Sequence, residues 1–534
     1  MKHYPKTRTA LCGLLIPALL PAAGGAPNRQ QPNIILIMAD DLGFSDIGCY
    51  GSEIATSHLD KLAKEGLRFS QFYNASRSCP TRASLLTGLY QHQAGVGDMM
   101  NNLGHPSYQG YINTSCVTLA EVLKSAGYST FMSGKWHVGN RPETLPVRRG
   151  FDRYFGNVDG AGSYFERIPY RMNQKAPRMM LDSADYEPPR NNFYFTNAIA
   201  DYALEFIGGR DADRPFFLYL AFTAPHWPLH ALPEDIQKYR GKYRTGWDDI
   251  RNQRYKKLSK LGLFPEKYAL SARDAQVLDW NTLSESEKDE WDLRMAVYAA
   301  MVDRMDQNIG RIMDHLKATG QYDNTVVVFL SDNGASHEAT KNRDNYIRTE
   351  GATGTRESFD AYERPWANVS NTPFRMYKHW VHEGGISTPF IIRYPGKHWG
   401  RSITQEVGHI IDLMPTLVEI SGASYPAMHN GHPIVPMEGI SLLPALRSGP
   451  LTRTTPLFWE HEGNRAVRDG DWKLVSRFDT GRKKQGPWEL YNIKQDRTEQ
   501  QDVSAANPER TQKMIEEYEQ WAERVGVVAK ERLF

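Results

Sequence analysis

The polar residues that directly follow apolar runs are the main candidates for binding and catalysis in this chain. Two of these runs, residues 32–38 and 324–330, lead into an acidic pair and an Asp–Asn pair: Asp40, Asp41, Asp332 and Asn333. Three carboxylates and one amide make an oxygen-only ligand set, which suits a hard cation such as Ca²⁺ or Mg²⁺ and not zinc. A cation would also remove the repulsion among carboxylates held close together. Either pair alone would often be a turn or a helix cap.

Basic side chains accompany the acidic ones. They are Arg82, Lys135, His137, His226 and Lys378. A metal ion beside several cations indicates a small tetrahedral oxyanion as the substrate. His382 is also near Lys378 in the chain, but we interpret this lone histidine as an ordinary buried or surface residue.

The stretch SRSCPTRASLLTG, residues 76–88, places Ser78 at the start of a predicted helix, one turn before Arg82. A free serine is a weak nucleophile unless a base activates it, and no Gly-x-Ser-x-Gly elbow surrounds this one. Ser78 is therefore either a helix cap or the target of a modification that makes it reactive. The amides at the start of the helix could add donors to a bound anion.

The elements that must position these residues alternate between strands and helices. Near-continuous apolar runs at 32–38, 128–134, 215–222 and 324–330 predict strands buried on both faces, and helical patterns cover 58–69, 117–127, 195–207 and 295–320. This alternation predicts an α/β fold with a large, mostly parallel sheet sandwiched by helices. Ligands bind beyond the carboxyl ends of such strands, so the polar clusters should converge there.

Two irregular stretches, 156–192 and 335–374, read as long polar loops that could contact substrate. Candidate contact residues in polar loops are Asp98, Arg343, Asn345 and Glu350, although each could equally be a solvated loop residue. From about residue 452 the pattern changes to antiparallel strands at 466–478 and 487–493 and a final helix at 508–525. We predict a catalytic domain over 32–451 and a smaller C-terminal α+β domain over 452–534.

The N-terminus predicts export. A basic start is followed by a short apolar run, residues 9–20, and then by small residues, which is typical of a signal peptide over 1–25. The run is too short to be a stable membrane anchor, so we expect a periplasmic or secreted protein. The net charge of +2 gives no reason to expect nucleic acid as a partner. Once Cys12 leaves with the signal, the three remaining cysteines cannot all pair.

The order Ser78-x-Pro80-x-Arg82, followed by LLTG, resembles the signature of the type I, formylglycine-dependent sulfatases of the alkaline phosphatase-like superfamily. The resemblance extends through ILIMADDLG, GKWHVG, APHWP, LSDNG, YKHWVHEGGISTPF, RDGDWKLV and WELYNI, and so covers nearly the whole chain. Thr81 departs from the serine that is usual at that place. Because Cys79 would break the spacing to Pro80 and Arg82, Ser78 is the predicted precursor, as in serine-type bacterial arylsulfatase-like members.

This resemblance implies a mechanism. Ser78 would be converted to formylglycine by a sulfatase-maturating radical enzyme, and its hydrate would attack the sulfur of a sulfate ester. One Ca²⁺ ion would be held by Asp40, Asp41, Asp332, Asn333 and the modified Ser78. Sulfate binding and proton transfer would fall to Arg82, Lys135, His137, His226 and Lys378. Among these, His226 and Lys378 would protonate the leaving alcohol, and His137 would help to remove a proton from the second hydroxyl of the hydrate.

The substrate stays open between several classes. We expect an exo-acting carbohydrate sulfatase on sulfated, galactose-type glycans. The alternatives are a true arylsulfatase that acts on aryl sulfates, and a phosphoesterase or phosphonate hydrolase of the same superfamily. A sulfated-glycan-binding protein that has lost catalysis is a further alternative, which an unmodified Ser78 would favour.

Overall fold

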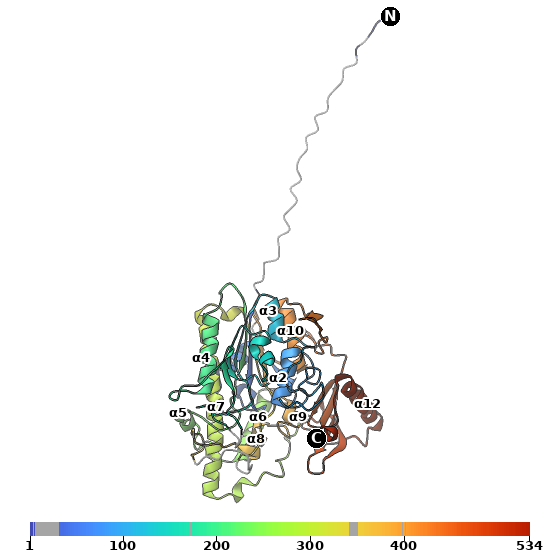
Figure 1. The fold of residues 1–534 in the computed structure, drawn as a ribbon. Coiled ribbons are helices and arrows are strands. Elements are labelled where there is room, and N and C mark those ends of the chain that lie inside the picture. The colour runs from blue at the N-terminus through green and yellow to red at the C-terminus, as the bar shows by residue number, and fades with distance from the viewer. Residues whose placement is uncertain are drawn as a thin grey trace.

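A large twisted sheet forms the centre of the molecule in this computed structural model (Figure 1). The structure describes residues 1–3, 5, 31–169, 174–340, 351–397, 399–400 and 402–533. The four predicted strands are confirmed as β1 (Asn33–Ala39), β3 (Ser129–Gly134), β7 (Phe216–Ala221) and β8 (Thr325–Ser331). They lie side by side in the order β8-β1-β7-β3, and all three pairings are parallel. Their carboxyl ends therefore meet at one edge, as the sequence predicts.

The sheet is ten-stranded, in the order β10-β2-β9-β8-β1-β7-β3-β4-β5-β6. Its outer strands are β2 (Leu67–Tyr73), β4 (Arg153–Asn157), β5 (Met179–Leu181), β6 (Ala184–Asp185), β9 (Phe390–Arg393) and β10 (Ile403–His409). β9 runs antiparallel between β8 and β2, and β5 and β6 are antiparallel at the other edge. The sheet is thus mixed but mostly parallel.

Helices cover both faces of this sheet because its strands are apolar on both sides. Along β1, Ile35 and Ile37 face one core, and Ile34, Leu36 and Met38 face the other, as the two-residue period of a strand requires. The first core includes residues from α1 (Ser57–Glu65), α4 (Phe195–Gly208), α6 (Trp247–Lys260), α7 (Glu285–Ala318) and α8 (Glu363–Ser370). The second includes residues from α2 (Ser78–Thr87), α3 (Leu119–Ser125), α10 (Leu413–Ser421) and α11 (Leu443–Leu446). Figure 1 shows α4 and α7 on the opposite side of the sheet from α2 and α10.

A second, antiparallel sheet lies near the C-terminus (Figure 1). It has the order β13 (Leu457–His461), β14 (Asn464–Asp469), β15 (Trp472–Asp479) and β16 (Lys484–Asn492), and α12 (Pro508–Val525) packs on it. The predicted antiparallel pair is confirmed, as is the final helix. A separate core that includes Trp459, Leu474 and Trp521 holds this part together. The fold class is therefore the expected one, an α/β sandwich with a smaller α+β part.

The remaining elements are short. They are α5 (Pro233–Gln237), α9 (Glu383–Ile386), β11 (Met428–His429), β12 (His432–Pro433) and the 3₁₀ turns Gly48–Tyr50, Pro142–Thr144, Pro146–Arg148, Trp280–Thr282, Tyr322–Asn324, Ile410–Asp412 and Lys530–Arg532. Cys49, Cys79 and Cys116 are buried and unpaired.

Several predicted boundaries are wrong. The helix expected over 58–69 ends before Gly66, and β2 follows at once. A Cβ atom at Gly66 would lie 2.7 Å from the carbonyl oxygen of Ile392, so only glycine allows this close approach. α7 begins ten residues earlier than expected, at a capping box formed by Ser284 and Glu287. The stretch 335–374 contains α8, and 156–192 contains β5 and β6.

Candidate active site

The acidic residues that follow β1 and β8 come together as the sequence predicts. The Asp41 amide donates to Asp332 Oδ1 at 3.2 Å, and Asn333 Nδ2 donates to Asp41 Oδ1 at 2.7 Å. Asp40 and Asn333 are fully buried, yet Asp40 Oδ1 and Asn333 Oδ1 have no hydrogen-bond partner within the described parts of the chain. Two such oxygens, surrounded by further carboxylate oxygens, could ligate a hard divalent cation. The residues present therefore fit the predicted metal.

Three cations hold these carboxylates. Lys135 Nζ lies 2.6 Å from Asp40 Oδ2, Arg82 Nη2 lies 2.8 Å from Asp332 Oδ2, and Lys378 Nζ lies 2.9 Å from Asp41 Oδ2. We call the seven residues the strand-end cluster: Asp40, Asp41, Arg82, Lys135, Asp332, Asn333 and Lys378. Its charges are buried and come from five separate segments of the chain. Such an arrangement of cations can bind a small anion once the carboxylates are neutralised by a metal.

The electrostatics of the two central carboxyls differ. Burial, followed by the charge of Asp332, raises the pKa of Asp40 to about 8. Burial would also raise the pKa of Asp332, but Arg82 and Lys135 hold it below its usual range. One carboxyl of the pair thus carries the negative charge more readily than the other, which is the behaviour of like-charged acids that share a site.

Ser78 is the first residue of α2, and its hydroxyl lies beside the strand-end cluster. Ser78 Oγ accepts from Arg82 Nε at 3.0 Å, one helical turn ahead, and lies 3.2 Å from His137 Nδ1. The helix cap is Arg77, whose side chain makes no capping hydrogen bond. The helix-cap alternative for Ser78 is therefore wrong, because its hydroxyl points to a base and a cation.

His226 and Lys378 form a second polar pair beside Asp41. His226 Nδ1 lies 2.5 Å from the carbonyl oxygen of Trp227, so Nδ1 carries the proton and Nε2 is the acceptor. Nε2 lies 3.4 Å from Lys378 Nζ. Burial lowers the pKa of His226 to about 4, whereas Asp41 and Glu338 raise the pKa of Lys378 against the opposing effect of its burial. At neutral pH the pair is therefore a neutral imidazole and an ammonium group.

Sequence reasoning missed Glu338 and Arg77. Glu338 Oε2 accepts from Lys378 Nζ at 3.0 Å and from Trp227 Nε1 at 2.9 Å, and Arg77 lies 3.4 Å from Glu338 Oε1. No motif marks Glu338, which stands in a stretch that we expected to be a polar loop. For Arg77, the available signal in the sequence was its place directly before Ser78.

Other candidates lie elsewhere. Asp98 is buried outside the strand-end cluster, and its charge acts on His461 and Cys79. His382 is buried with Nε2 3.6 Å from Glu489 Oε2, and neither ring nitrogen has a hydrogen-bond partner among the described residues; it lies outside the strand-end cluster. Arg343, Asn345 and Glu350 lie outside the described residues, as does most of the predicted signal peptide. Among the helices that the structure describes, none has the length and apolar character needed to cross a membrane.

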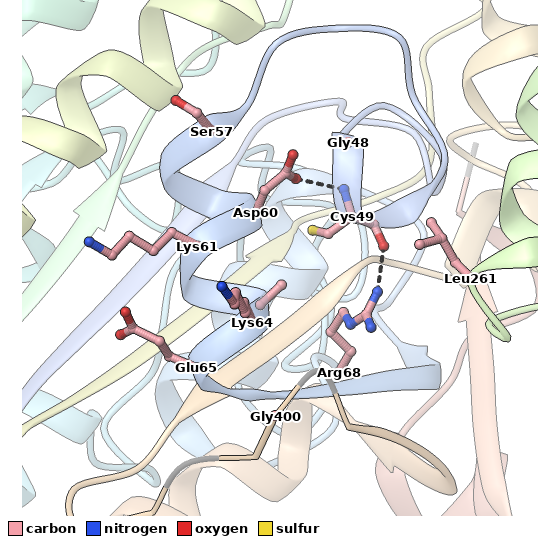
Figure 2. Close-up of a pocket in the computed structure, with 11 residues that line it drawn as sticks. Gly48, Cys49, Ser57, Asp60, Lys61, Lys64, Glu65, Arg68, Leu261 and Gly400 are labelled. Atoms are coloured by element: carbon pink, nitrogen blue, oxygen red, sulfur yellow. Dashed lines mark hydrogen bonds between the residues drawn. The ribbon is translucent and has the colours of Figure 1, made fainter.

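A large cavity is separate from this cluster. It measures about 760 Å³ and lies near the start of β2, whereas Ser78 follows the end of that strand. Figure 2 shows two of its polar side chains bonded to the backbone of Cys49: Asp60 Oδ1 accepts from the amide at 2.6 Å, and Arg68 donates to the carbonyl oxygen at 2.9 Å. These contacts serve the local fold and give the cavity no set of convergent reactive groups.

Comparisons with known proteins show similarity along most of the chain. The family profile "Sulfatase" matches residues 32–423, and the profile "N-sulphoglucosamine sulphohydrolase, C-terminal" matches residues 374–524. An uncharacterized sulfatase of Schizosaccharomyces pombe is 36% identical over 93% of this chain and 95% of its own. An arylsulfatase of Klebsiella aerogenes is 37% identical over 79% of this chain and 93% of its own.

More distant relatives include sugar sulfatases. The N-acetylgalactosamine-6-sulfatase of Rattus norvegicus is 29% identical over 86% of this chain and 74% of its own. The crystal structure of Ps i-CgsB superposes with a TM-score of 0.67 at 28% identity and covers 92% of this chain and 93% of that one. Ps i-CgsB has also been solved in complex with k-i-k-neocarrahexaose. The chain therefore belongs to the sulfatase family of the alkaline phosphatase-like superfamily and is a sulfuric ester hydrolase.

Proposed function

We propose that this sulfatase uses formylglycine made from Ser78 as its nucleophile. The observation that carries the proposal is the position of Ser78 Oγ, which lies 3.0 Å from Arg82 Nε and 3.2 Å from His137 Nδ1 at the start of α2. An unmodified serine could attack a sulfate ester but would stay sulfated. The hydrated aldehyde of formylglycine supplies a second hydroxyl, through which sulfate can be released.

We propose one calcium ion in the same site. Its ligands would be Asp40, Asp41, Asp332, Asn333 and the modified Ser78. The unpartnered oxygens of Asp40 and Asn333 support this set, since a buried polar atom without a partner is costly unless a ligand satisfies it. When bound, calcium would polarise the sulfate ester and offset the charge on its oxygens.

The side chains around Ser78 have separate roles in this proposal. Arg82 and Lys135 bind sulfate oxygens, because both are buried cations; Arg82 contacts Ser78, and Lys135 contacts the proposed metal ligand Asp40. His137 holds and removes a proton at the oxygen of residue 78. Its pKa lies well below the usual range because of burial and the charges of Lys135 and Arg82, so it is a neutral base at pH 7.

Lys378 would donate a proton to the leaving oxygen. Its ammonium group lies 3.4 Å from the unprotonated Nε2 of His226, which can orient it and share its proton. Glu338, at 3.0 Å, holds the same ammonium group from another side. Glu338 would thus be a positioning residue for the proposed acid.

For the substrate, we propose a sulfated carbohydrate with a galactose-type sugar at the end of a glycan. The likeness to an N-acetylgalactosamine-6-sulfatase and to Ps i-CgsB, which binds a neocarrahexaose, supports this choice. The likeness to an arylsulfatase favours aryl sulfates as the second candidate. The N-terminal pattern supports export to a compartment where a sulfatase would meet such polymers. The serine at position 78 supports maturation by a radical enzyme of the host. We also propose that residues 32–451 form the catalytic domain and residues 452–534 the smaller C-terminal domain.

The test combines mass spectrometry with mutation. The peptide that contains Ser78, isolated from enzyme made in its native host, should be lighter than the serine form by about two hydrogen masses. Ser78→Ala should abolish sulfate release, whereas Ser84→Ala in the same helix should retain it. An active enzyme with unmodified Ser78, or an active Ser78→Ala variant, would remove formylglycine from the mechanism.

A further inference from the structure

The turn between β13 and β14 brings the C-terminal sheet against the segments that carry Ser78 and Lys378. His461 ends β13, and Glu462 and Gly463 form the turn, both with left-handed φ angles, 49° and 81°. Glu462 Oε2 lies 2.6 Å from His379 Nδ1, and Asn464 Nδ2 lies 3.3 Å from His379 Nε2. Positive φ at both residues is the usual geometry of a two-residue hairpin turn, and this turn places the Glu462 carboxylate against His379.

These residues stand next to the sulfate site along two segments. His379 directly follows Lys378, and its amide donates to the carbonyl oxygen of Ser76 at 2.8 Å. The charge of Arg77, the neighbour of Ser78, acts on both Glu462 and Asp41. We call His379, His461 and Glu462 the turn cluster; one donor or acceptor atom of each lies within 4.8 Å of the others. The turn cluster is therefore linked to Lys378 by sequence and to the segment of Ser78 by this hydrogen bond, on the side of the C-terminal sheet.

The turn cluster has polar atoms that the described part of the protein leaves without partners. His461 is fully buried, and neither of its ring nitrogens has a hydrogen-bond partner. Asp98, whose charge acts on His461, also has one unpartnered buried oxygen. Buried polar atoms are nearly always paired. His382 also lacks hydrogen bonds within the described residues, but its Nε2 faces Glu489 at 3.6 Å, whereas the unpartnered atoms of His461 and Asp98 belong to two residues that act on each other and could share a ligand.

The hydrogen bonds of His379 argue for an organic ligand and against a metal. Two imidazoles and a carboxylate could hold zinc in principle. Both nitrogens of His379 are already engaged, however: Nδ1 donates to Glu462, and Nε2 accepts from Asn464, so the ring has no free lone pair for a metal. Glu462 keeps its second oxygen as an acceptor, and a neutral His461 offers one donor and one acceptor. Such a mixed set matches neighbouring hydroxyl groups.

We propose that the turn cluster is a specificity subsite for the alcohol part of the sulfate ester, and that it selects a leaving group with neighbouring hydroxyls, as in a sugar. The inference rests on the proposed function. Glu462 would accept hydrogen bonds from hydroxyls, and His461 would donate one and accept another. An aryl group has no donors for these positions, so the subsite would discriminate against it. The C-terminal sheet would then determine substrate choice while the strand-end cluster performs the chemistry.

The experiment compares two substrate types on matured, calcium-loaded enzyme. We expect Glu462→Gln and His461→Leu to lower kcat/KM for the best sulfated monosaccharide by roughly 10- to 100-fold, mainly through KM, while nitrophenyl sulfate changes by less than about twofold. Asp471→Asn, which removes the same charge at an exposed turn of the same sheet, is the control and should change neither. Glu462→Gln keeps the size of the side chain in case His461→Leu fails to fold.

Each contrary outcome has its own meaning. Equal losses on both substrates, or no loss on either, would overturn the subsite. If wild-type enzyme hydrolyses nitrophenyl sulfate but none of the galactose, galactosamine and glucosamine sulfates, the subsite is wrong and the sulfatase function stands. If it hydrolyses none of the sulfate esters, the proposed function itself fails. If the wild-type enzyme holds stoichiometric zinc and Glu462→Gln loses it, the turn cluster is a metal site and the sugar subsite is wrong.

Discussion

Two buried clusters of charge in this protein use the same residue types in different ways. In the strand-end cluster, Asp40 keeps one oxygen without a partner, and its pKa is raised to about 8 by burial and by Asp332. The second, which we call the interface cluster, consists of Glu383, Lys473, Arg497 and Glu499. Burial opposes the charge of Glu383, yet Lys473 and Arg497 lower its pKa to about 2.

Both oxygens of Glu383 have partners. Lys473 Nζ lies 2.9 Å from Oε1, and the hydroxyls of Tyr73 and Ser387 each donate to Oε2 at 3.0 Å. Lys473 belongs to β15 and Glu383 to α9, so this cluster fastens the C-terminal sheet to the main one. The difference lies in the central carboxylates. Both oxygens of Glu383 have partners, and Glu499 Oε1, which has no hydrogen bond among the described residues, lies 2.8 Å from Lys473 Nζ, whereas Asp40 keeps one oxygen that a ligand could satisfy.

The largest expected effect, and the strongest test of the difference between the two clusters, comes from Asp332→Ala in the strand-end cluster. It removes one proposed metal ligand and leaves Arg82 with Asp40 at 3.8 Å as its nearest acidic partner. We expect the rate of sulfate ester hydrolysis to fall by about 10³-fold or more, with loss of bound calcium. Assays of sulfate release and elemental analysis measure the two effects.

The matched control is Asp323→Ala, an exposed acid just before the other end of β8, which should leave activity and calcium unchanged. Stoichiometric zinc in the wild-type enzyme, or full activity after exhaustive chelation, would contradict a calcium site.

Lys473→Met tests the interface cluster. It leaves Glu383 and Glu499 buried with less compensation, and breaking a buried ion pair in this way costs about 3–5 kcal/mol. We expect the free energy of unfolding in urea to fall by that amount, with kcat on nitrophenyl sulfate unchanged while the protein is folded. Lys494→Met, which removes an exposed partner of Asp471, should cost less than about 1 kcal/mol. Equal effects of the two variants would mean that burial does not distinguish the pairs.

Low pH should reduce the stability that Glu383 contributes in the interface cluster, with a smaller effect than Lys473→Met. The pKa of Glu383 is about 2 in the folded protein and near 4.5 when the chain is unfolded. The unfolded state therefore binds the proton first, so the contribution of Glu383 to stability is present above pH 4.5 and is lost as the pH falls toward 2. Between these values, wild-type stability should fall more steeply than that of Glu383→Gln, by about 1.4 kcal/mol per pH unit at most. Parallel curves from urea unfolding at pH 3 to 5 would refute this assignment.

The strand-end cluster could be predicted in large part from the sequence. Uninterrupted apolar runs fix where β1 and β8 end, and the spacing of Ser78 and Arg82 by four residues places both on one face of a helix. Glu338 could not be predicted, because its position depends on Lys378 and Trp227, which are distant in the chain. Contacts of that kind leave no local pattern.

The interface and turn clusters were missed for the same reason. Lys473, Glu383 and Glu499 come from three separate segments, and the turn at Glu462 reads in sequence as an ordinary hairpin connection. Errors in local structure have a different origin. The start of α7 could have been predicted from the capping residues Ser284 and Glu287, whereas the helical pattern of α1 continues past Gly66 into β2 and conceals the boundary.

The smallest expected effect concerns the cavity of Figure 2, which is large but has exposed lysines in place of buried charges, and so serves as a contrast to both clusters. Lys61 and Lys64 line this cavity and are exposed, so water already solvates their charges, and neither resembles the buried cations of the other two clusters. The double variant Lys61→Ala/Lys64→Ala should change the free energy of unfolding by less than about 1 kcal/mol and kcat/KM by less than twofold. The cavity lies at the start of β2, and the seven residues of that strand separate it from Ser78 by roughly 20 Å. A tenfold loss of activity on a polymeric substrate, with nitrophenyl sulfate unaffected, would show that size and exposed charge identify a binding site here better than unsatisfied buried atoms do.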